Sequence, residues 1–270
     1  MRKLLSVALL TAFSAPVLAG GGGLTAPGMQ ALSQTKGWQN VKKDYENGTV
    51  TAPAKAGSLT IKQPTLNSAS LNTKGQYVVP ENAQTIEFMF HTGDADFNSC
   101  LSVGLYDNDP STVLNIKDNV GWQVLADNTK MVQTGQWISF TQNFEAGDDL
   151  VLRLWNKDKH GNYGHEIFFN GAESSAVGSA SQYSKDKMNH AVIAENVATA
   201  SYVEGGYRYD YTYSVVGFED MYCCPDNDWD DVVFTIRTGT VTAVPEPETY
   251  AMLLAGLGMI GTIVRRRRNK

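Results

Sequence analysis

Between residues 84 and 240, hydrophobic side chains recur with a period of two, and no window there sustains the period of 3.6 expected of a helix. Such alternation directs one side of a strand into a core and the other side away from it. Segments rich in Gly, Asp, Asn and Pro separate the alternating runs. The pattern predicts an all-β, antiparallel β-sandwich, of which a jelly roll is one form. The alternating runs are 86–90, 101–105, 150–154, 207–215 and 232–236.

Shorter segments flank this domain in the 270-residue chain. We expect a cleaved signal over 1–19, a flexible Gly-rich leader over 20–57, the β-sandwich over 58–240 and a sorting tail over 245–270. The leader is small, polar and rich in glycine, which is typical of a flexible segment. A short helix around 29–38 also fits this stretch.

The charge of the middle of the chain argues against one class of partner. The formal net charge of the whole chain is −6, but seven of its 22 basic and only two of its 28 acidic residues lie in the end segments. The middle therefore carries 15 basic and 26 acidic residues, a net charge of −11. Because a nucleic-acid binder needs a basic surface to meet phosphate, nucleic acid is not an expected partner.

The N-terminus has the three parts of a secretory signal peptide. Arg2 and Lys3 form a positive start, residues 4–17 form an apolar run, and Ala19 ends a small-residue cleavage site. We expect signal peptidase to cut after Ala19. The alternative, a membrane-spanning helix, is disfavoured because the run is short and is followed by glycines at 20–23.

The C-terminus carries a Pro-Glu-Pro motif, then an apolar run over 250–264, then a cluster of arginines. The run is shorter than the roughly 20 residues that a helix needs to cross a bilayer comfortably. Basic residues at its end favour the cytoplasmic side of a membrane. The residues of the motif and the cluster are Pro245, Glu246, Pro247, Arg265, Arg266, Arg267 and Arg268.

This tail resembles the PEP-CTERM sorting signal of Gram-negative bacteria. The resemblance implies a single transmembrane segment that holds the exported protein transiently in the inner membrane. It also implies cleavage by an exosortase, a membrane protease, and delivery to the cell surface or to the exopolysaccharide matrix. A plain C-terminal anchor is the alternative.

Six carboxylates lie within 13 residues at the junction of two expected strands. Such crowding is repulsive unless a cation is present, and calcium accepts six to eight oxygen ligands in irregular loops. The spacing resembles the opening of an EF-hand loop, but an aspartate replaces the required glycine. We predict a calcium site here, with a solvated acidic turn and a catalytic site as alternatives. The carboxylates are Glu219, Asp220, Asp226, Asp228, Asp230 and Asp231.

The same region resembles the signature of the DUF4114 family. The resemblance rests on Gly-Phe-Glu-Asp at 217–220, on the aspartate-rich turn, on Val-Val-Phe at 232–234 and on His190 as an upstream element. It covers about 84–238 and implies an exported protein, but the family has no established activity to carry over. The loop departs from the family, because Cys-Cys-Pro at 223–225 stands where glycines are common.

The three cysteines fit an oxidising compartment, where a disulfide is favoured. Adjacent cysteines rarely bond to each other, because the geometry is strained. We therefore expect Cys100 to pair with either Cys223 or Cys224, which leaves one thiol over.

Other candidate groups carry a weaker signal. Two sets of side chains are able to contact a metal, but polar turns explain both. They are His160 with His165, and His91 with Asp94 and Asp96. The chain has no Gly-x-Ser-x-Gly elbow, no His-Glu-x-x-His and no phosphate loop, so we expect it not to be an enzyme.

These observations favour a non-enzymatic protein of the cell surface or the exopolysaccharide matrix, as in a biofilm, built on a calcium-stabilised β-sandwich. One alternative is a carbohydrate-binding module for exopolysaccharide, with Trp122, Trp137, Trp155 and Trp229 stacking on sugar rings. A polysaccharide-active hydrolase is another, since its paired carboxylates leave no local sequence signature.

Overall fold

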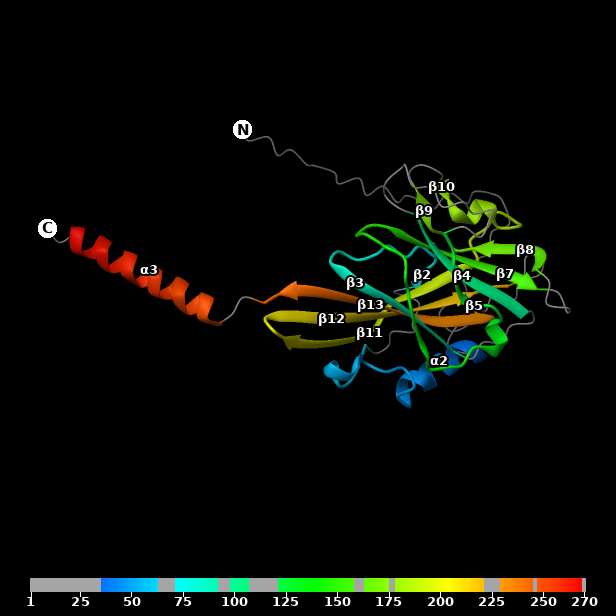
Figure 1. Cartoon of the computed structure of the whole chain (residues 1–270), viewed down its shortest axis with the longest axis horizontal. Helices are drawn as coiled ribbons and strands as arrows, with labels where there is room; N and C mark the ends of the chain where they lie inside the picture. Colours follow the sequence, from blue (N-terminus) through cyan, green and yellow to red (C-terminus); the bar gives the residue numbers. More distant parts are fainter. Residues whose placement is uncertain are drawn as a thin grey trace, which may run out of the picture.

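Two antiparallel sheets face each other, which confirms the predicted β-sandwich (Figure 1). The larger sheet has seven strands in the order β1-β11-β12-β13-β3-β6, with β2 also paired to β11, and the smaller has four in the order β5-β4-β7-β8. A computed structural model describes residues 35–62, 71–91, 98–106, 121–157, 163–174, 178–220, 229–244 and 247–268.

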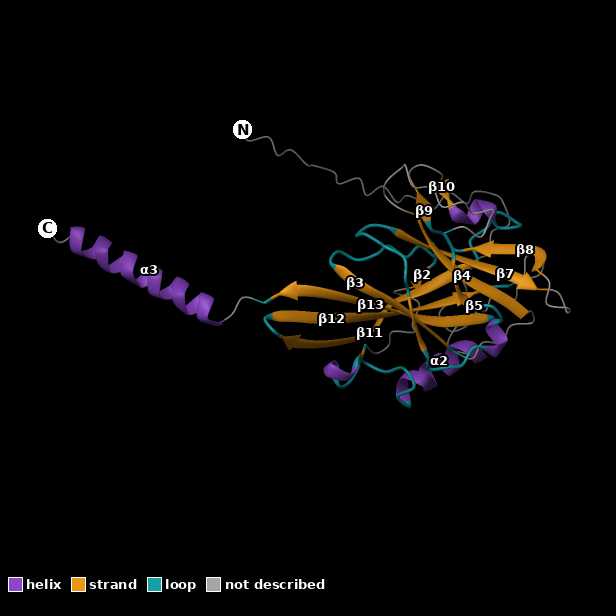
Figure 2. Ribbon diagram, in the orientation of Figure 1, coloured by secondary structure: helices purple, strands orange, loops and turns teal. Residues whose placement is uncertain are grey.

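The elements are coloured by type in Figure 2. The seven-stranded sheet contains β1 (Thr60–Ile61), β2 (Leu71–Asn72), β3 (Ala83–Phe90), β6 (Trp137–Ser139), β11 (Ala191–Glu204), β12 (Tyr207–Phe218) and β13 (Val232–Ala243). The four-stranded sheet contains β4 (Asn98–Tyr106), β5 (Gln123–Ala126), β7 (Asp149–Lys157) and β8 (Tyr163–Phe169), and β9 (Glu173–Ser174) pairs with β10 (Gly178–Ser179). The helices are α2 (Lys36–Glu46), α3 (Pro247–Arg268), η1 (Ala54–Ala56), η3 (Thr129–Met131) and η4 (Ala180–Tyr183).

The main core lies between the two sheets and is built from the predicted alternating residues. One side of each central strand faces this core, as the period of two requires. The core side chains include Ile86, Phe88 and Phe90 of β3, Leu101 and Val103 of β4, Leu150, Leu152 and Leu154 of β7, and Phe234 and Ile236 of β13.

A second core lies on the outer face of the seven-stranded sheet, where α2 packs. Trp38, Val41 and Tyr45 repeat at helical spacing and form its buried stripe. They contact the outward side of the sheet, including Val215 and Val233. A flexible leader over 20–57 is therefore the wrong description of residues 36–57, and the helix begins and ends later than the 29–38 stretch considered from sequence.

The chain after α2 is also fastened to the sheet. The Thr51 carbonyl accepts hydrogen bonds from Tyr213 Oη and from Arg237 Nη1, both at 3.2 Å. Trp137 Nε1 donates to Thr51 Oγ1 at 3.3 Å. The folded domain thus includes residues from Lys36 onward rather than from 58, and its last strand ends at Ala243.

The strands β11, β12 and β13 form a long ribbon that extends beyond the smaller sheet toward α3 (Figure 1). Its hairpin closes through Gly205 and Gly206, whose φ angles of 58° and 77° suit a tight two-residue turn between paired Glu204 and Tyr207. The tyrosines of the ribbon stack on one another. The ring centroids of Tyr202 and Tyr209 are 4.6 Å apart with an interplanar angle of 8°.

Asp149, at the start of β7, makes the stability of the fold depend on pH. Its Oδ2 accepts hydrogen bonds from Gln76 Nε2 at 2.7 Å and from the Glu173 amide at 2.8 Å. Burial nevertheless raises the pKa of this carboxyl to about 6. The folded state therefore holds the proton more tightly than the unfolded state, and this contribution to stability falls as the pH rises from about 4 to about 6.

In an Asp149→Asn variant we expect that loss to disappear, because the amide oxygen still accepts hydrogen bonds and carries no charge. The free energy of unfolding of the variant, relative to wild type, should rise by about 3 kcal/mol between pH 3.5 and pH 7. Urea unfolding of both proteins across this range measures the difference, and other titrating groups cancel. A difference that stays constant with pH would contradict the assignment.

Candidate functional site

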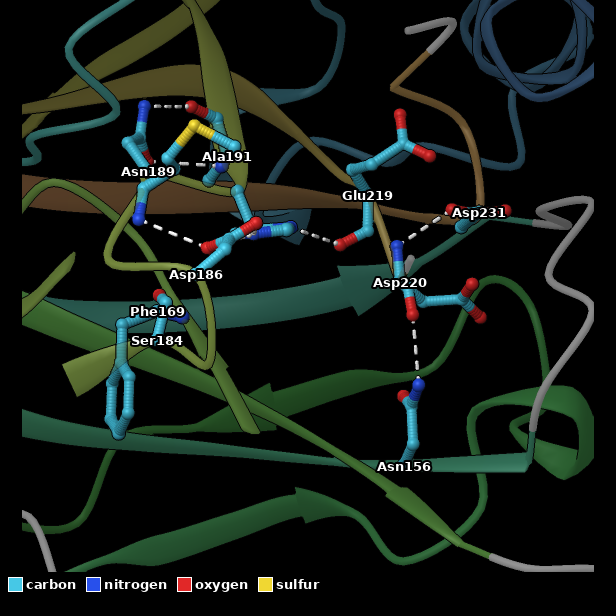
Figure 3. Close-up of polar contacts among 11 residues, drawn as sticks. Asn156, Phe169, Ser184, Asp186, Asn189, Ala191, Glu219, Asp220 and Asp231 are labelled. Atoms are coloured by element: carbon cyan, nitrogen blue, oxygen red, sulfur yellow. Dashed lines mark hydrogen bonds and ion pairs between the residues drawn. The ribbon is translucent and has the colours of Figure 1, made fainter. Parts of the chain in front are cut away.

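The predicted acidic corner lies where β12 ends and β13 begins (Figure 3). Glu219, Asp220 and Asp230 are buried there, and Asp231 is half-buried. Asp226 and Asp228 fall outside the described residues. The structure therefore places four of the six predicted carboxylates at one end of the sandwich.

Two of these carboxylates bind backbone amides. Asp230 Oδ2 accepts a hydrogen bond from the Gly37 amide at 2.6 Å, and this amide belongs to the first turn of α2. A carboxylate at that position satisfies an otherwise unpaired helix donor and lies at the positive end of the helix dipole. Asp231 Oδ2 accepts from the Asp220 amide at 2.7 Å. Asp230 and Asp231 therefore cap backbone amides, as the acidic-turn alternative predicts for these two residues.

His190 fixes the backbone of the acidic corner through a hydrogen bond to Glu219. Its Nδ1 donates to the Glu219 carbonyl at 3.1 Å, while its Nε2 lies 3.0 Å and 3.1 Å from the two carboxylate oxygens of Asp186. Both ring nitrogens therefore face acceptors, an arrangement that an imidazolium ion satisfies. The Phe168 ring covers the imidazole, with the ring centroids 4.2 Å apart.

Asp186 is the charge partner of His190. Burial acts to raise the pKa of the Asp186 carboxyl, but the hydrogen bond and the charge of His190 outweigh it and hold the pKa below its ordinary value. The sequence signal at 189–190 pointed to the histidine, but Asp186, which lies four residues upstream, was missed. An Asp and a His at that spacing carry no recognisable pattern in a loop.

A buried series of two hydrogen bonds connects the Asp220 carbonyl to the smaller sheet. Asn156 Nδ2 of β7 donates to it at 2.8 Å. Asn156 Oδ1 in turn accepts from Ser99 Oγ of β4 at 2.8 Å. Both sheets are thus joined at the corner through polar side chains that sequence analysis did not single out.

The side chains of Glu219 and Asp220 point away from each other in Figure 3, as expected for neighbouring residues at a strand end. Among the residues that the structure describes, no three His, Cys, Asp or Glu side chains are placed to hold a metal ion. Calcium binding therefore remains a prediction, and it depends on Asp226 and Asp228.

His91 binds a different carboxylate from the ones considered in the sequence. Its Nδ1 lies 2.7 Å from Asp44 Oδ2 of α2, and its Nε2 lies 2.8 Å from Thr235 Oγ1 of β13. Both ring nitrogens are thereby used, which leaves none for a cation. Asp94 and Asp96 lie outside the described residues, as does His160, the suggested partner of His165.

Cys100 is buried in β4, and its Sγ is 3.8 Å from Ser102 Oγ. Cys223 and Cys224 are outside the described residues, so the disulfide stays a prediction. Cys100 and Ser99 are successive residues of β4 and point to opposite faces of the smaller sheet.

The tryptophans suggested for sugar stacking are engaged in packing. Trp229 is buried, so stacking by this residue is wrong. Trp137 lies under the Arg237 guanidinium, 3.9 Å from ring centroid to Cζ. Arg153 lies 4.2 Å from the Trp122 centroid and 5.3 Å from that of Trp155.

The C-terminal tail forms α3, whose apolar side chains, including Leu254 and Ile260, are exposed. No helix in the described part of the chain combines the length and the apolar character of a membrane span.

Comparison with protein families finds one match at this tail. Residues 243–268 match the family described as PEP-CTERM protein-sorting motif. A search of curated proteins finds none that matches the chain. The resemblance of 84–238 to DUF4114 is supported by neither comparison. The motif indicates export, transient membrane anchoring in a Gram-negative bacterium and processing by an exosortase, so the chain is an exported protein that carries an exosortase sorting signal.

Proposed function

We propose that the chain is a non-enzymatic protein of the cell surface or the exopolysaccharide matrix, with a β-sandwich that calcium stabilises at the acidic corner. The sorting motif supports the first part of the proposal. The observation that supports the second is the burial of Glu219, Asp220 and Asp230 beside a loop that adds Asp226 and Asp228. Buried negative charge of this density is costly without a compensating positive charge.

The ligands in this proposal divide by role. Asp230 and Asp231 already bind backbone amides and shape the corner. Asp226 and Asp228 would supply the oxygens that enter the site from the loop. The coordination shell of a calcium ion would then be completed by Glu219 or Asp220, by carbonyl groups and by water. Calcium accepts such a set of oxygen ligands.

Three described side chains, Asp44, His91 and Thr235, form a hydrogen-bonded series that resembles a catalytic arrangement. Its order of carboxylate, imidazole and hydroxyl is the order used by nucleophilic hydrolases. However, Thr235 is fully buried and the His91 side chain is closed off as well. No substrate reaches such a hydroxyl, and the contacts instead tie α2 to β13.

Thermal melting with and without calcium tests the metal site. If the ion binds only the folded state, a free concentration 100-fold above its Kd adds about 2.7 kcal/mol to the free energy of unfolding. In Asp228→Ala most of this gain should be lost, and the protein without calcium should be as stable as wild type or slightly more so, because repulsion falls. The matched control is Asp210→Ala, since Asp210 forms an ion pair with Arg208 on the ribbon.

An acidic turn without a metal predicts the reverse behaviour. Wild type would then show no response to millimolar calcium after treatment with a chelator. Asp228→Ala would lose about 0.5–2 kcal/mol in both conditions, the usual cost of a missing cap. If the melting temperature of wild type does not change with calcium, the proposed metal site is wrong.

A further inference from the structure

The sorting motif follows the folded domain without a spacer. The family match begins at residue 243, and β13 ends at Ala243. The next residue, Val244, still donates its amide to the Gly206 carbonyl at 2.8 Å. Only residues 245 and 246 separate it from α3. Three peptide units reach about 11 Å at most, so an enzyme that holds the Pro-Glu-Pro motif also meets the end of the ribbon.

The end of the ribbon exposes apolar side chains. We call Val203, Glu204, Gly205, Gly206 and Tyr207, together with Val244, the hairpin tip. Val203 is 64% exposed, Tyr207 is 50% exposed and Val244 is 36% exposed. These are large apolar side chains at the projecting end of the ribbon, which a solvent-facing hairpin does not need for its own packing.

The charges around the hairpin tip are already paired. Lys55 forms an ion pair with Glu204, and Arg208 pairs with Asp210 at 2.9 Å. Across the hairpin, Glu204 pairs with Tyr207 and Val203 pairs with Arg208, so Tyr207 lies on one face of the ribbon and Val203 on the other. Each face of the tip therefore carries an exposed apolar side chain beside a neutralised ion pair. A tip of this form suits insertion into a groove of a protein that contacts both faces, with the apolar side chains buried and the paired charges at the edge.

The ribbon behind the hairpin tip is held in one shape. Tyr202 stacks on Tyr209, and the Tyr211 ring lies 6.3 Å from Tyr202 at an angle of 18°. All twelve residues of β12 are paired with β13. A rigid surface at a fixed distance from a bound motif loses little entropy on docking.

We propose that the hairpin tip is a docking surface for the exosortase, which it contacts while the enzyme holds the sorting motif. Val203 on one face of the tip and Tyr207 on the other are the anchors, and the short link through Val244 sets their distance from the motif. The proposal rests on processing by an exosortase and is independent of calcium binding. Its test and the calcium test can therefore fail separately.

Processing in cells that contain the exosortase tests this proposal on the full chain. In a Val203→Ser/Tyr207→Ser variant we expect cleavage of the tail to slow about fivefold or more, as when a buried interface anchor is truncated. Intact mass measures the fraction of chains that retain Arg265 to Arg268 over time. The matched control is Val124→Ser, because Val124 is 52% exposed on β5, away from the ribbon. Melting temperatures of all variants verify that each is folded.

Insertion of eight Gly and Ser residues between Val244 and Pro245 provides a second test. Because the link then no longer presents the hairpin tip to the enzyme, cleavage should slow, and the tip substitutions should add no further loss. Faster cleavage after insertion would mean that the tip only obstructs the enzyme, which would overturn the proposal. Normal cleavage of the tip variant would also overturn the proposal. If that variant also bound phosphatidylethanolamine–phosphatidylglycerol vesicles more weakly than wild type, the tip would be a membrane contact instead.

Discussion

In a Trp38→Ala variant, the free energy of unfolding is expected to fall by about 3–5 kcal/mol. Trp38 is 2% exposed and packs α2 onto the seven-stranded sheet. Its indole lies so close to Gly217 that a Cβ at that position would be 2.8 Å from Trp38 Cζ2. The indole Nε1 also donates to the Trp229 carbonyl at 3.2 Å. Removal of the ring leaves a cavity that the flanking strands cannot fill.

Urea unfolding of the mature protein measures this loss. The matched control is Lys42→Ala in the same helix, since the Lys42 side chain is 64% exposed. A surface change of this kind usually alters stability by no more than about 0.5 kcal/mol. If both variants behaved alike, α2 would not be part of the cooperative fold, and residues 36–57 would be the flexible leader that composition predicts.

Loss of Glu87 is expected to have the second large effect, about 3 kcal/mol in Glu87→Leu. Glu87 Oε2 accepts from Arg237 Nε at 2.8 Å and lies 2.6 Å from Nη2. Both side chains are largely buried between β3, β13 and the segment that contains Thr51. Without the carboxylate, the Arg237 guanidinium keeps the Thr51 carbonyl and the rings of Trp137, Tyr211 and Tyr213, none of which carries a negative charge.

The double variant Glu87→Leu/Arg237→Met separates charge from packing. If the loss in Glu87→Leu comes from an uncompensated buried charge, removal of the arginine should restore much of the stability. The double-mutant cycle should then show a coupling energy above about 1 kcal/mol. Losses that simply add would show that the two side chains act independently, against the ion-pair explanation.

Five strands, β3, β4, β7, β12 and β13, were predictable because alternation is a local signal. Every run with a period of two in the sequence, such as 86–90 and 150–154, lies within a strand of the structure. The burial of Phe88 and Leu152 follows from the same pattern, because each sheet buries one face. The sorting tail was equally visible, since its motif, apolar run and arginines are contiguous.

The candidate site was only partly visible. The density of carboxylates identified Glu219, Asp220, Asp230 and Asp231, and the resemblance to DUF4114 drew attention to His190. Their partners carried no local pattern. Asn156 is one polar residue in a hydrophobic strand, and it reaches Asp220 only because β7 lies opposite the end of β12.

The sequence alone determined the sorting signal of the chain, five of its strands and the place where acidic residues gather, because each of these depends on neighbouring residues. Only the tertiary structure decided what the helix at 36–46 does and which partners each polar group finds. A short amphipathic helix gains most of its stability from packing, not from its own propensity. Asp230 and Gly37 are 193 residues apart, and His91 and Thr235 are 144 apart. Such pairs form only when the sheet brings distant segments together and buried polar groups must find partners.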